Sequence, residues 1–291
     1  MAEITVSCCC KINLFLQVTG RRSDGYHSLR TLFMPVKDVE DFVTCDFDSA
    51  PGIEVCARQP EIPSGKDNLM YRAAELYAAV SGVTPNWKFV LDKNIPVAAG
   101  LGGGSSNAAA VFKALNSRYS ALDEQQLRAA AVKLGADVPF FLDAVPAWAD
   151  GIGEQLSALP EAHLPLYIVL VNPGFPVGVR WSFGKLDASM FRQADDGVKD
   201  SLNRALADND VEKIAQLCRN DLGTALFEKF PQLELLKRSM LNAGASTVQV
   251  SGSGPTLFAL CRSKEIRSAV ADGVREDFKT SSGIRIFECE V

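Results

Sequence analysis

Hydrophobic and polar residues alternate between residues 11 and 18, which is the period of a β-strand. The two faces of such a strand carry Ile12, Leu14, Leu16 and Val18 on one side and Lys11, Asn13, Phe15 and Gln17 on the other. Lys11 and Asn13 are therefore expected side by side. A polar, glycine-bearing stretch at 19–25 predicts a loop, and the apolar run at 29–36 predicts a second strand, with further β-like segments to about residue 57.

Helical spacing of apolar residues begins after residue 68 and then alternates with short apolar runs. Asp67 or Asn68 can cap the first helix, and Gly82 can end it. The interleaving predicts an α+β chain whose second half resembles a ferredoxin-like sheet with extra helices. The expected elements are helices that include 69–80, 108–115, 123–135, 198–207, 211–222, 231–241 and 264–274, and strands that include 87–91, 166–171 and 284–290, with two more strands flanking the turn at 251–255.

The length of 291 residues is sufficient for two ordinary domains. Pro and Gly recur near residues 145–160, where the helical pattern lapses, so we expect one domain at 1–150 and a second at 151–291. A composition of 47% hydrophobic and 22% charged residues is typical of folded globular proteins. The chain is therefore expected to bury a full core.

The net charge of -5 provides no overall positive field to attract nucleic acid or anionic lipid. No apolar stretch approaches the roughly 20 residues that span a bilayer, and Glu3 stands where a secretory signal carries positive charge. The sequence predicts a cytoplasmic protein with neither a nucleic-acid nor a membrane partner.

The eight cysteines include no C-x-x-C pair, and the chain has only two histidines. Zinc sites are commonly built from such pairs together with histidine. We therefore expect reduced, mostly structural thiols, and the sequence identifies no metal ligand.

A glycine-rich segment, Gly100–Ser106, leads into the helix expected around 108–115. Three consecutive glycines let the backbone approach an anion, and the free N–H groups at the helix start would hold phosphate oxygens. The hydroxyls of Ser105 and Ser106 can donate to the phosphates or reach a magnesium ion bound to them. The segment lacks the Gly-Lys-[Ser/Thr] end of a Walker A loop, and Ser105 replaces the third Gly or Ala of a dinucleotide fingerprint. A phosphate site of another type is predicted, with a tight structural turn as the alternative.

Four further features are ambiguous when each is taken alone. Lys11 beside Asn13 also fits a solvated strand, and Asp137, between a helix end and an apolar run, also fits a cap or an ion pair. The pair Tyr26-His27 offers a ring face and an imidazole edge to a heterocyclic base, or is an ordinary loop pair. The turn at 251–255 is either a plain hairpin or a second set of backbone amides for an anion.

Taken together, these motifs resemble the GHMP kinases, named for galactokinase and for homoserine, mevalonate and phosphomevalonate kinases. The resemblance covers nearly the whole chain. It is carried by Lys-Ile-Asn-Leu-Phe-Leu at 11–16, Arg-x-Asp-Gly-Tyr-His at 22–27, the segment 96–108, Gly-Ala-Asp-Val-Pro-Phe-Phe at 135–141 and Ser-Gly-Ser-Gly-Pro-Thr at 251–256.

The resemblance implies a two-domain fold, with an N-terminal domain like ribosomal protein S five domain two and a ferredoxin-like C-terminal domain. It implies ATP as phosphoryl donor, accompanied by Mg²⁺. By motif, Asp137 would be the catalytic base and Lys11 would orient the acceptor hydroxyl and offset charge on the transferred phosphate. The turn residues Ser251, Gly252, Ser253 and Gly254 would border the same cleft. The ATP-binding residues would be Pro96, Ala99, Gly100, Leu101, Gly102, Gly103, Gly104, Ser105 and Ser106.

In combination and in this order, the first four of these motifs resemble those of the GHMP kinases whose acceptor is a cytidyl diphosphate sugar alcohol, phosphorylated on its 2-hydroxyl. His27 would then bond the cytosine edge between the rings of Tyr26 and Phe183, and Asn13 would contact the sugar-alcohol end or the diphosphate. Stacking on a base is worth roughly 1–3 kcal/mol. Trp181 is close enough in sequence to replace Phe183 as the stacking ring.

The segment after Asn172-Pro173-Gly174 departs from the family pattern, because Gly178 and Val179 stand where the family usually has Ser-Thr. Three alternatives remain at this point: another GHMP acceptor such as mevalonate, homoserine or a sugar; a nucleotide-binding regulator without turnover; and a nicotinamide-dependent dehydrogenase. The resemblance implies no obligate protein partner.

Overall fold

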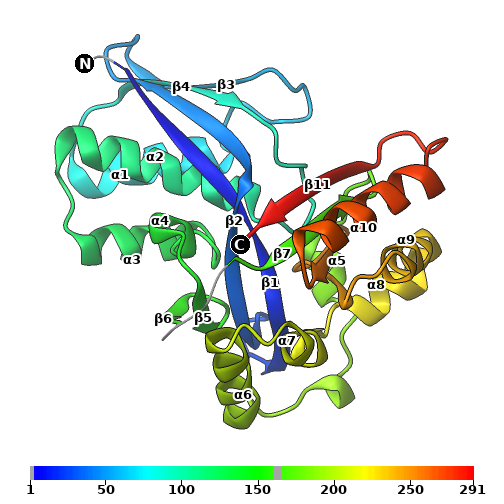
Figure 1. The fold of residues 1–291 in the computed structure, drawn as a ribbon. Helices are drawn as coiled ribbons and strands as arrows, with labels where there is room; N and C mark the ends of the chain where they lie inside the picture. Colours follow the sequence, from blue (N-terminus) through cyan, green and yellow to red (C-terminus); the bar gives the residue numbers. More distant parts are fainter. Residues whose placement is uncertain (1–2, 160–164) are drawn as a thin grey trace. The chain divides into compact units, whose positions relative to one another are not determined.

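The computed structural model describes residues 3–159 and 165–291. The chain forms two compact units, and each unit is assembled from several chain segments (Figure 1). The predicted division at residue 150 is a different partition and stays a prediction. The first unit consists of Met1–Cys10, Val39–Ile95 and Gly102–Val145, and the second of Lys11–Asp38, Pro96–Leu101 and Pro146–Val291. Two long strands, β1 (Glu3–Arg21) and β2 (His27–Asp46), contribute residues to both.

The first unit is built around a parallel pair of strands joined by a helix. Strands β3 and β4 pair in parallel, and β4 also pairs antiparallel with the end of β2. Helix α1 connects β3 to β4 and packs against α2. The elements are β3 (Gly52–Ala57), α1 (Leu69–Ser81), β4 (Asn86–Asp92), α2 (Gly103–Tyr119), α3 (Glu124–Leu134) and α4 (Phe140–Asp143).

Capping residues explain where two of these helices begin, and both caps were predicted. The Asn68 side chain accepts from the backbone N–H of Met70, and Gly82 ends α1 with a left-handed φ of 74°. Asp123 and Gln126 form the full capping box of α3. Local sequence chemistry therefore determines these helix starts.

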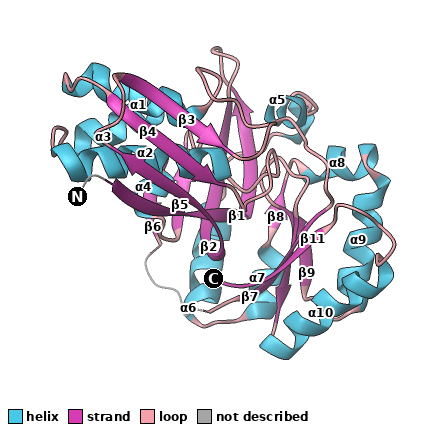
Figure 2. Cartoon of the chain, turned by 90° about the horizontal axis from the view of Figure 1, so that it is seen from above, coloured by secondary structure: helices cyan, strands magenta, loops and turns pink. Residues whose placement is uncertain are grey.

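The second unit contains a four-stranded antiparallel sheet in the order β11-β7-β10-β9. In chain order within this sheet, β7, β9, β10 and β11 are first to fourth, so the spatial order 4-1-3-2 is that of a ferredoxin-like sheet. Residues of α8, α9 and α10 join the sheet in one hydrophobic core. Figure 2 shows the backbone of these helices beside the sheet. The elements are β7 (Tyr167–Asn172), α8 (Gly223–Lys229), α9 (Pro231–Asn242), β9 (Thr247–Val250), β10 (Leu257–Cys261), α10 (Lys264–Asp277) and β11 (Arg285–Glu290).

The remaining strands of the second unit attach to the later part of β1 and the earlier part of β2. β8 pairs in parallel with β1, and the hairpin β5–β6 pairs antiparallel with β2. The elements are β5 (Ala147–Asp150), β6 (Gln155–Ala158), α5 (Val179–Phe183), the 3₁₀ turn η1 (Ala188–Met190), α6 (Asp196–Ala207), α7 (Val211–Leu217) and β8 (Arg219–Asn220). The α+β class is confirmed.

One predicted helix is wrong at its end. The helix expected at 211–222 stops at Leu217, because the next residues pair with β1 at Phe15 and Leu16 as strand β8. The short elements α4, α5, β5 and β6 were not predicted, since none exceeds five residues and so none shows a clear period.

The eight cysteines, all of which lie within the described residues, form no disulfide, and seven of them are buried. Burial raises the pKa of Cys8, Cys45, Cys218, Cys261 and Cys289 to about 12, so these groups are neutral thiols at physiological pH.

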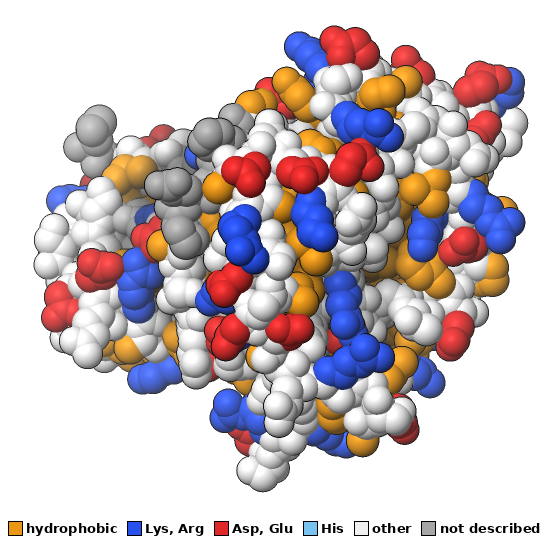
Figure 3. All heavy atoms as spheres, turned by 60° about the horizontal axis from the view of Figure 1, so that its bottom comes forward, with side chains coloured by type: hydrophobic (Ala, Val, Ile, Leu, Met, Phe, Trp, Pro, Cys, Tyr) orange, Lys and Arg blue, Asp and Glu red, His pale blue; other side chains and the backbone are white. Residues whose placement is uncertain are grey.

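On the face drawn in Figure 3, acidic and basic side chains are interspersed. Within the described ranges, no helix has the length and apolar character needed to cross a membrane.

Candidate functional site

Lys11 and Asn13 lie side by side on β1, as the alternation predicts. The Lys11 Nζ donates to Asn13 Oδ1 at 2.6 Å and to the carbonyl oxygen of Gly100 at 3.0 Å. Asn13 Nδ2 in turn donates to Thr31 Oγ1 at 2.8 Å, and Thr31 Oγ1 donates to the carbonyl oxygen of Phe15. Lys11 and Asn13 are each only 3% exposed. The ammonium group is therefore held at a defined point beside the backbone of the glycine-rich segment.

The turn at 251–254 meets the glycine-rich segment at the same place. Ser251 Oγ donates to the carbonyl oxygen of Gly100 at 3.0 Å. Gly100 has a φ of 78°, and a Cβ there would overlap the Ser251 carbonyl oxygen, so this close approach of two backbones requires glycine. The buried Asn220 side chain donates to the carbonyl oxygen of Gly252 at 2.8 Å and holds the turn.

Carbonyl oxygens of the segment Pro96–Leu101 accept further bonds within the second unit. The backbone N–H of Lys11 donates to Leu101, and that of Thr256 donates to Ala99. The segment is thus fixed by β1 on one side and by the residues after the 251–254 turn on the other. The segment therefore lies beside Lys11 and Ser251, two of the predicted site residues of the second unit.

The rest of the glycine-rich segment, Gly102–Ser106, belongs to the first unit and begins α2. Gly102 has a φ of 72° and occupies the N-cap without a side-chain bond, and its carbonyl oxygen accepts from the N–H of Ser106 at 2.9 Å. The N–H groups in the first turn of a helix lack intrahelical acceptors, and the helix dipole makes this end positive. With the Ser105 and Ser106 hydroxyls nearby in the chain, this helix start is suited to phosphate oxygens.

Asp137 lies in the turn that connects α3 to α4, also in the first unit. The residue is half-buried, and the N–H of Val138 next to it donates to the carbonyl oxygen of Gly135 at 3.1 Å. Asp137 belongs to the first unit and Lys11 to the second, so the role of Asp137 as the base stays a prediction.

His27 lies in a group of aromatic rings in the second unit. Its ring stacks on Phe183 with 5.4 Å between centroids and meets Phe191 edge-on at 5.8 Å. Burial and the nearby charge of Arg21 lower the pKa of His27 below its usual 6.5. The imidazole is therefore neutral at physiological pH and offers one donor and one acceptor. Tyr26, beside it in the chain, is 60% exposed.

The two candidate stacking rings have different surroundings. Phe183 contacts His27, whereas the Trp181 ring packs on Phe230 at 5.8 Å and joins the core of the ferredoxin-like sheet. Trp181 also lies under the ammonium of Lys229, 4.3 Å from the ring centroid. Of the two, Phe183 is the ring that accompanies His27.

The departure from the family pattern falls at the start of α5. Gly178 occupies the N-cap and provides no side-chain bond, and the following Val179 is 60% exposed. A Ser or Thr at an N-cap would bond a backbone N–H in the first turn. This five-residue helix therefore starts without the cap that the family residues would supply.

Sequence reasoning missed the residues that hold the predicted ones in place. Thr31 secures Asn13, Asn220 secures the 251–254 turn, and Phe191 packs against His27. Each contact joins residues at least 18 positions apart, which periodicity cannot reveal. The one available signal was a polar residue inside an apolar stretch, as with Thr31 in the run at 29–36.

Two family models match the chain. The model of the GHMP kinases N terminal domain matches residues 68–144, and the model of the GHMP kinases C terminal domain matches residues 202–280. A curated relative from Syntrophotalea carbinolica, named 4-diphosphocytidyl-2-C-methyl-D-erythritol kinase, is 38% identical over 281 residues, which is 96% of each chain.

Solved structures show the same relationship. A crystal structure of 4-(cytidine 5'-diphospho)-2C-methyl-D-erythritol kinase has a TM-score of 0.80 and 33% identity, and the match covers 99% of this chain and 98% of the other. A homoserine kinase from Cytophaga hutchinsonii has a TM-score of 0.76 at 18% identity, over 99% and 95% of the two chains, which shows a shared fold alone. The chain belongs to the GHMP kinases and, within them, to the family of 4-diphosphocytidyl-2-C-methyl-D-erythritol kinases.

Proposed function

We propose that this protein transfers the γ-phosphoryl group of ATP to the 2-hydroxyl of 4-diphosphocytidyl-2-C-methyl-D-erythritol. The products are ADP and the 2-phosphate of the acceptor, an intermediate of the methylerythritol phosphate route to isoprenoids. The observation that carries this proposal is the nearly end-to-end similarity to a curated kinase of that name, at 38% identity. Membership of a kinase family makes the chain an ATP-dependent enzyme.

Lys11 is the cation we assign to the reacting groups. Its ammonium is fixed by Asn13 and by the Gly100 carbonyl, and a preorganised cation stabilises the charge that develops on the transferred phosphoryl group. We also assign the Lys11 ammonium to orient the acceptor hydroxyl. Asn13 is assigned to the sugar-alcohol end or the diphosphate of the acceptor.

Asp137 is the base we assign to the 2-hydroxyl proton. A carboxylate can accept the proton as the oxygen attacks the γ-phosphorus, and phosphoryl transfer needs little else from the protein beyond positioning and charge. The residue sits in a turn between two helices, which can hold a side chain in one orientation.

The residues between Pro96 and Ser106 are assigned to the ATP phosphates, with the turn at 251–254 beside them. Mg²⁺ is proposed to arrive with ATP, because it favours phosphate, hydroxyl and water oxygens as ligands. Ser105 and Ser106 provide hydroxyl oxygens of that kind at the start of α2. Among the described residues, no group of three or more His, Cys, Asp or Glu side chains is placed to hold a metal ion.

His27, Tyr26 and Phe183 are assigned to the cytosine of the acceptor. A neutral imidazole can donate to and accept from the base edge, and aromatic rings supply stacking faces. The small acceptors of other GHMP kinases would leave this aromatic group without a partner. The cytidyl compound is therefore preferred over mevalonate, homoserine and sugars. The cytoplasmic location and the lack of an obligate protein partner stay predictions.

An acceptor panel tests the proposal directly. ADP release is measured with magnesium-ATP and, separately, the cytidyl compound, mevalonate, homoserine and galactose, and phosphorus NMR identifies the product. We expect turnover with the cytidyl compound alone and a new phosphomonoester signal. Turnover with a different acceptor would contradict the proposed substrate. No turnover with any of the four acceptors would contradict it as well.

Two variants test the assigned roles. Asp137→Asn removes the base with almost no change in volume, so turnover is expected to fall by at least about 100-fold while both substrates still bind. Asp143→Asn is the matched control, because Asp143 is an acid of α4 with 47% exposure and pairs with Arg128. His27→Ala is expected to raise the KM of the cytidyl acceptor far more than that of ATP, and equal changes would remove His27 from the cytosine site.

A further inference from the structure

A carboxylate that the proposed reaction does not use, Asp41, is completely buried in the first unit. Its Oδ2 accepts from Lys93 Nζ at 2.6 Å and from Asn107 Nδ2 at 2.9 Å. Its Oδ1 accepts from the backbone N–H groups of Asn94 and Ile95 at 2.7 and 2.8 Å. One side chain therefore collects four donors, one of them charged.

Three of these donors lie on either side of residues 96–106, the stretch that contains the glycine-rich segment. Asn94 and Ile95 are the last residues before Pro96, and Asn107 lies in the second turn of α2, just after Ser106. Asp41 thus connects the chain where it enters the segment to the helix where the chain leaves it.

Lys93 tightens the same connection. Its Nζ also donates to the carbonyl oxygen of Ile95 at 2.7 Å. A Cβ on residue 103 would lie only 2.9 Å from this Nζ, so Gly103 leaves the space that the ammonium occupies. Lys93 is 7% exposed at its side chain, and Asp41 is fully buried, so water does not compete for these bonds.

We propose that Asp41 is a positioning residue for the ATP phosphates, which acts by fixing the separation of the two ends of the glycine-rich segment. A segment held at both ends has fewer conformations to lose when phosphate binds, so the free energy cost of ordering it is smaller. The inference rests on the proposed function, because the role of the segment as the phosphate loop belongs to that proposal.

A purely structural role for Asp41 makes a different prediction. Loss of stability lowers the fraction of folded protein, and so the apparent kcat, but it does not change the nucleotide Kd of the molecules that remain folded. A positioning role raises the nucleotide Kd itself. The two roles are therefore separated by measuring binding affinity beside thermal stability.

The experiment is calorimetric titration with the magnesium complex of adenylyl imidodiphosphate, a non-hydrolysable ATP analogue. Asp41→Asn replaces one accepting oxygen by an amide N–H₂, which is itself a donor and cannot accept from Lys93 or Asn107. We expect the Kd for the ATP analogue to rise by about tenfold or more. Adding Asn107→Asp returns a carboxylate that can accept from the new amide and restores one negative charge to the network of Lys93, and we expect the double variant to recover to within about threefold of the original protein.

The matched control is Asp221→Asn in the second unit. Asp221 is also a buried acid, 7% exposed at its side chain, which pairs with Arg219 and accepts from the backbone N–H of Val18. We expect this variant to lower the melting temperature and to leave the nucleotide Kd within about twofold. If Asp41→Asn does not fold, Asn107→Ala removes one bond of the network and is expected to raise the Kd by about threefold or more.

An unchanged Kd in Asp41→Asn or Asn107→Ala would overturn the inference, as would a double variant that binds no better than Asp41→Asn. The proposed function is tested by a separate measurement, the phosphorylation of the cytidyl acceptor. If the original protein binds the analogue but does not phosphorylate the cytidyl acceptor, the substrate assignment is wrong, whereas the role of Asp41 in nucleotide binding can still be read from the Kd values.

Discussion

A buried carboxylate organises one charge network of this protein, and a buried guanidinium organises another. Asp41 is fully buried, and its charged partner Lys93 is 7% exposed at its side chain. Arg267 of α10 is also 7% exposed, but its acidic partners Glu288 and Glu290 are 27% and 43% exposed at their side chains. The first network is dry, whereas the acids of the second reach water.

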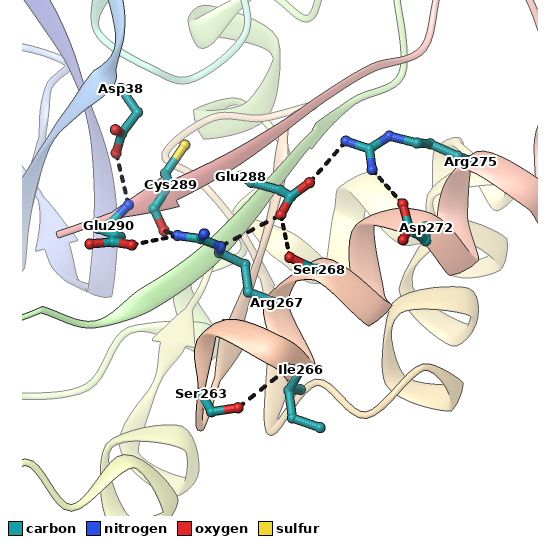
Figure 4. A network of polar contacts seen from close by, with 10 residues as sticks. All are labelled: Asp38, Ser263, Ile266, Arg267, Ser268, Asp272, Arg275, Glu288, Cys289 and Glu290. Atoms are coloured by element: carbon teal, nitrogen blue, oxygen red, sulfur yellow. Dashed lines mark hydrogen bonds and ion pairs between the residues drawn. The ribbon is translucent and has the colours of Figure 1, made fainter.

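The bonds of the second network are also more loosely arranged (Figure 4). Arg267 Nη1 donates to Glu290 Oε1 at 2.9 Å and to the carbonyl oxygen of Cys289 at 3.3 Å, but its Nε lies 3.7 Å from Glu288 Oε2, beyond hydrogen-bond distance. Glu288 receives its own bonds from Ser268 and Arg275. This network ties α10 to β11 with several partners that can replace one another.

The difference lies in what happens when one member is lost. A dry network leaves a bare charge behind, because no water can replace the missing partner, whereas a network with exposed acids lets water enter. We therefore expect the Asp41 network to fail as a unit and the Arg267 network to weaken by steps.

The largest effect is expected from Asp41→Leu, which keeps the number and branching of the side-chain heavy atoms but leaves the Lys93 ammonium buried without its carboxylate. Breaking a buried pair by removal of one partner costs about 3–5 kcal/mol of unfolding free energy. Lys93→Met should cost less, because Asp41 keeps three neutral donors in Asn94, Ile95 and Asn107. Urea unfolding of both variants measures the order, and a larger loss in Lys93→Met would show that the cation is the centre.

A smaller effect is expected from Arg267→Met, which keeps the aliphatic stem of a helical residue. Glu288 retains Ser268 at 2.8 Å and Arg275 at 3.1 Å, and Glu290 is exposed enough to be hydrated. We expect a loss of about 1–2 kcal/mol in urea unfolding with unchanged KM values for both substrates. A loss as large as that of Asp41→Leu would erase the distinction between the two networks.

Sequence periodicity predicted the parts of the molecule that local chemistry determines. The caps of α1 and α3 are as expected, and the alternation in β1 placed Lys11 beside Asn13, where the two side chains are 2.6 Å apart. The helix predicted through residue 222 ends earlier, because pairing of Arg219 and Asn220 with β1 outweighs the local helical preference.

Both charge networks escaped prediction for one reason. The Asp41 bonds span 52 to 66 positions in sequence, and the Arg267 bonds span 22 and 23. An acid in a strand or an arginine in a helix carries no local signal of such a partner. The one local signal in the sequence was a charged residue, Lys93, which stands shortly before Ile95 and the glycine-rich segment.

The smallest expected effect is the pH dependence of the stability that Glu288 contributes to the Arg267 network. The hydrogen bond from Ser268, assisted by Arg275, lowers the pKa of Glu288 below its usual 4.5. Because the folded pKa lies below the unfolded one, the ionised Glu288 contributes stability above pH 4.5, and this contribution is lost as pH falls through the folded pKa. The contribution is about 1 kcal/mol or less, since the group is partly hydrated.

Glu288→Gln removes this ionisation, so the variant should be less stable than the original protein at pH 7, and the difference should shrink as pH falls below 4.5. Urea unfolding at pH 7, 5 and 4 measures it, with Glu61→Gln as a control that makes the same charge change at an exposed position. A difference that stays constant with pH would mean that Glu288 acts through packing rather than charge. The Arg267 network would then differ less from the Asp41 network than the exposure of its acids suggests, because hydration of Glu288 would not determine its contribution to stability.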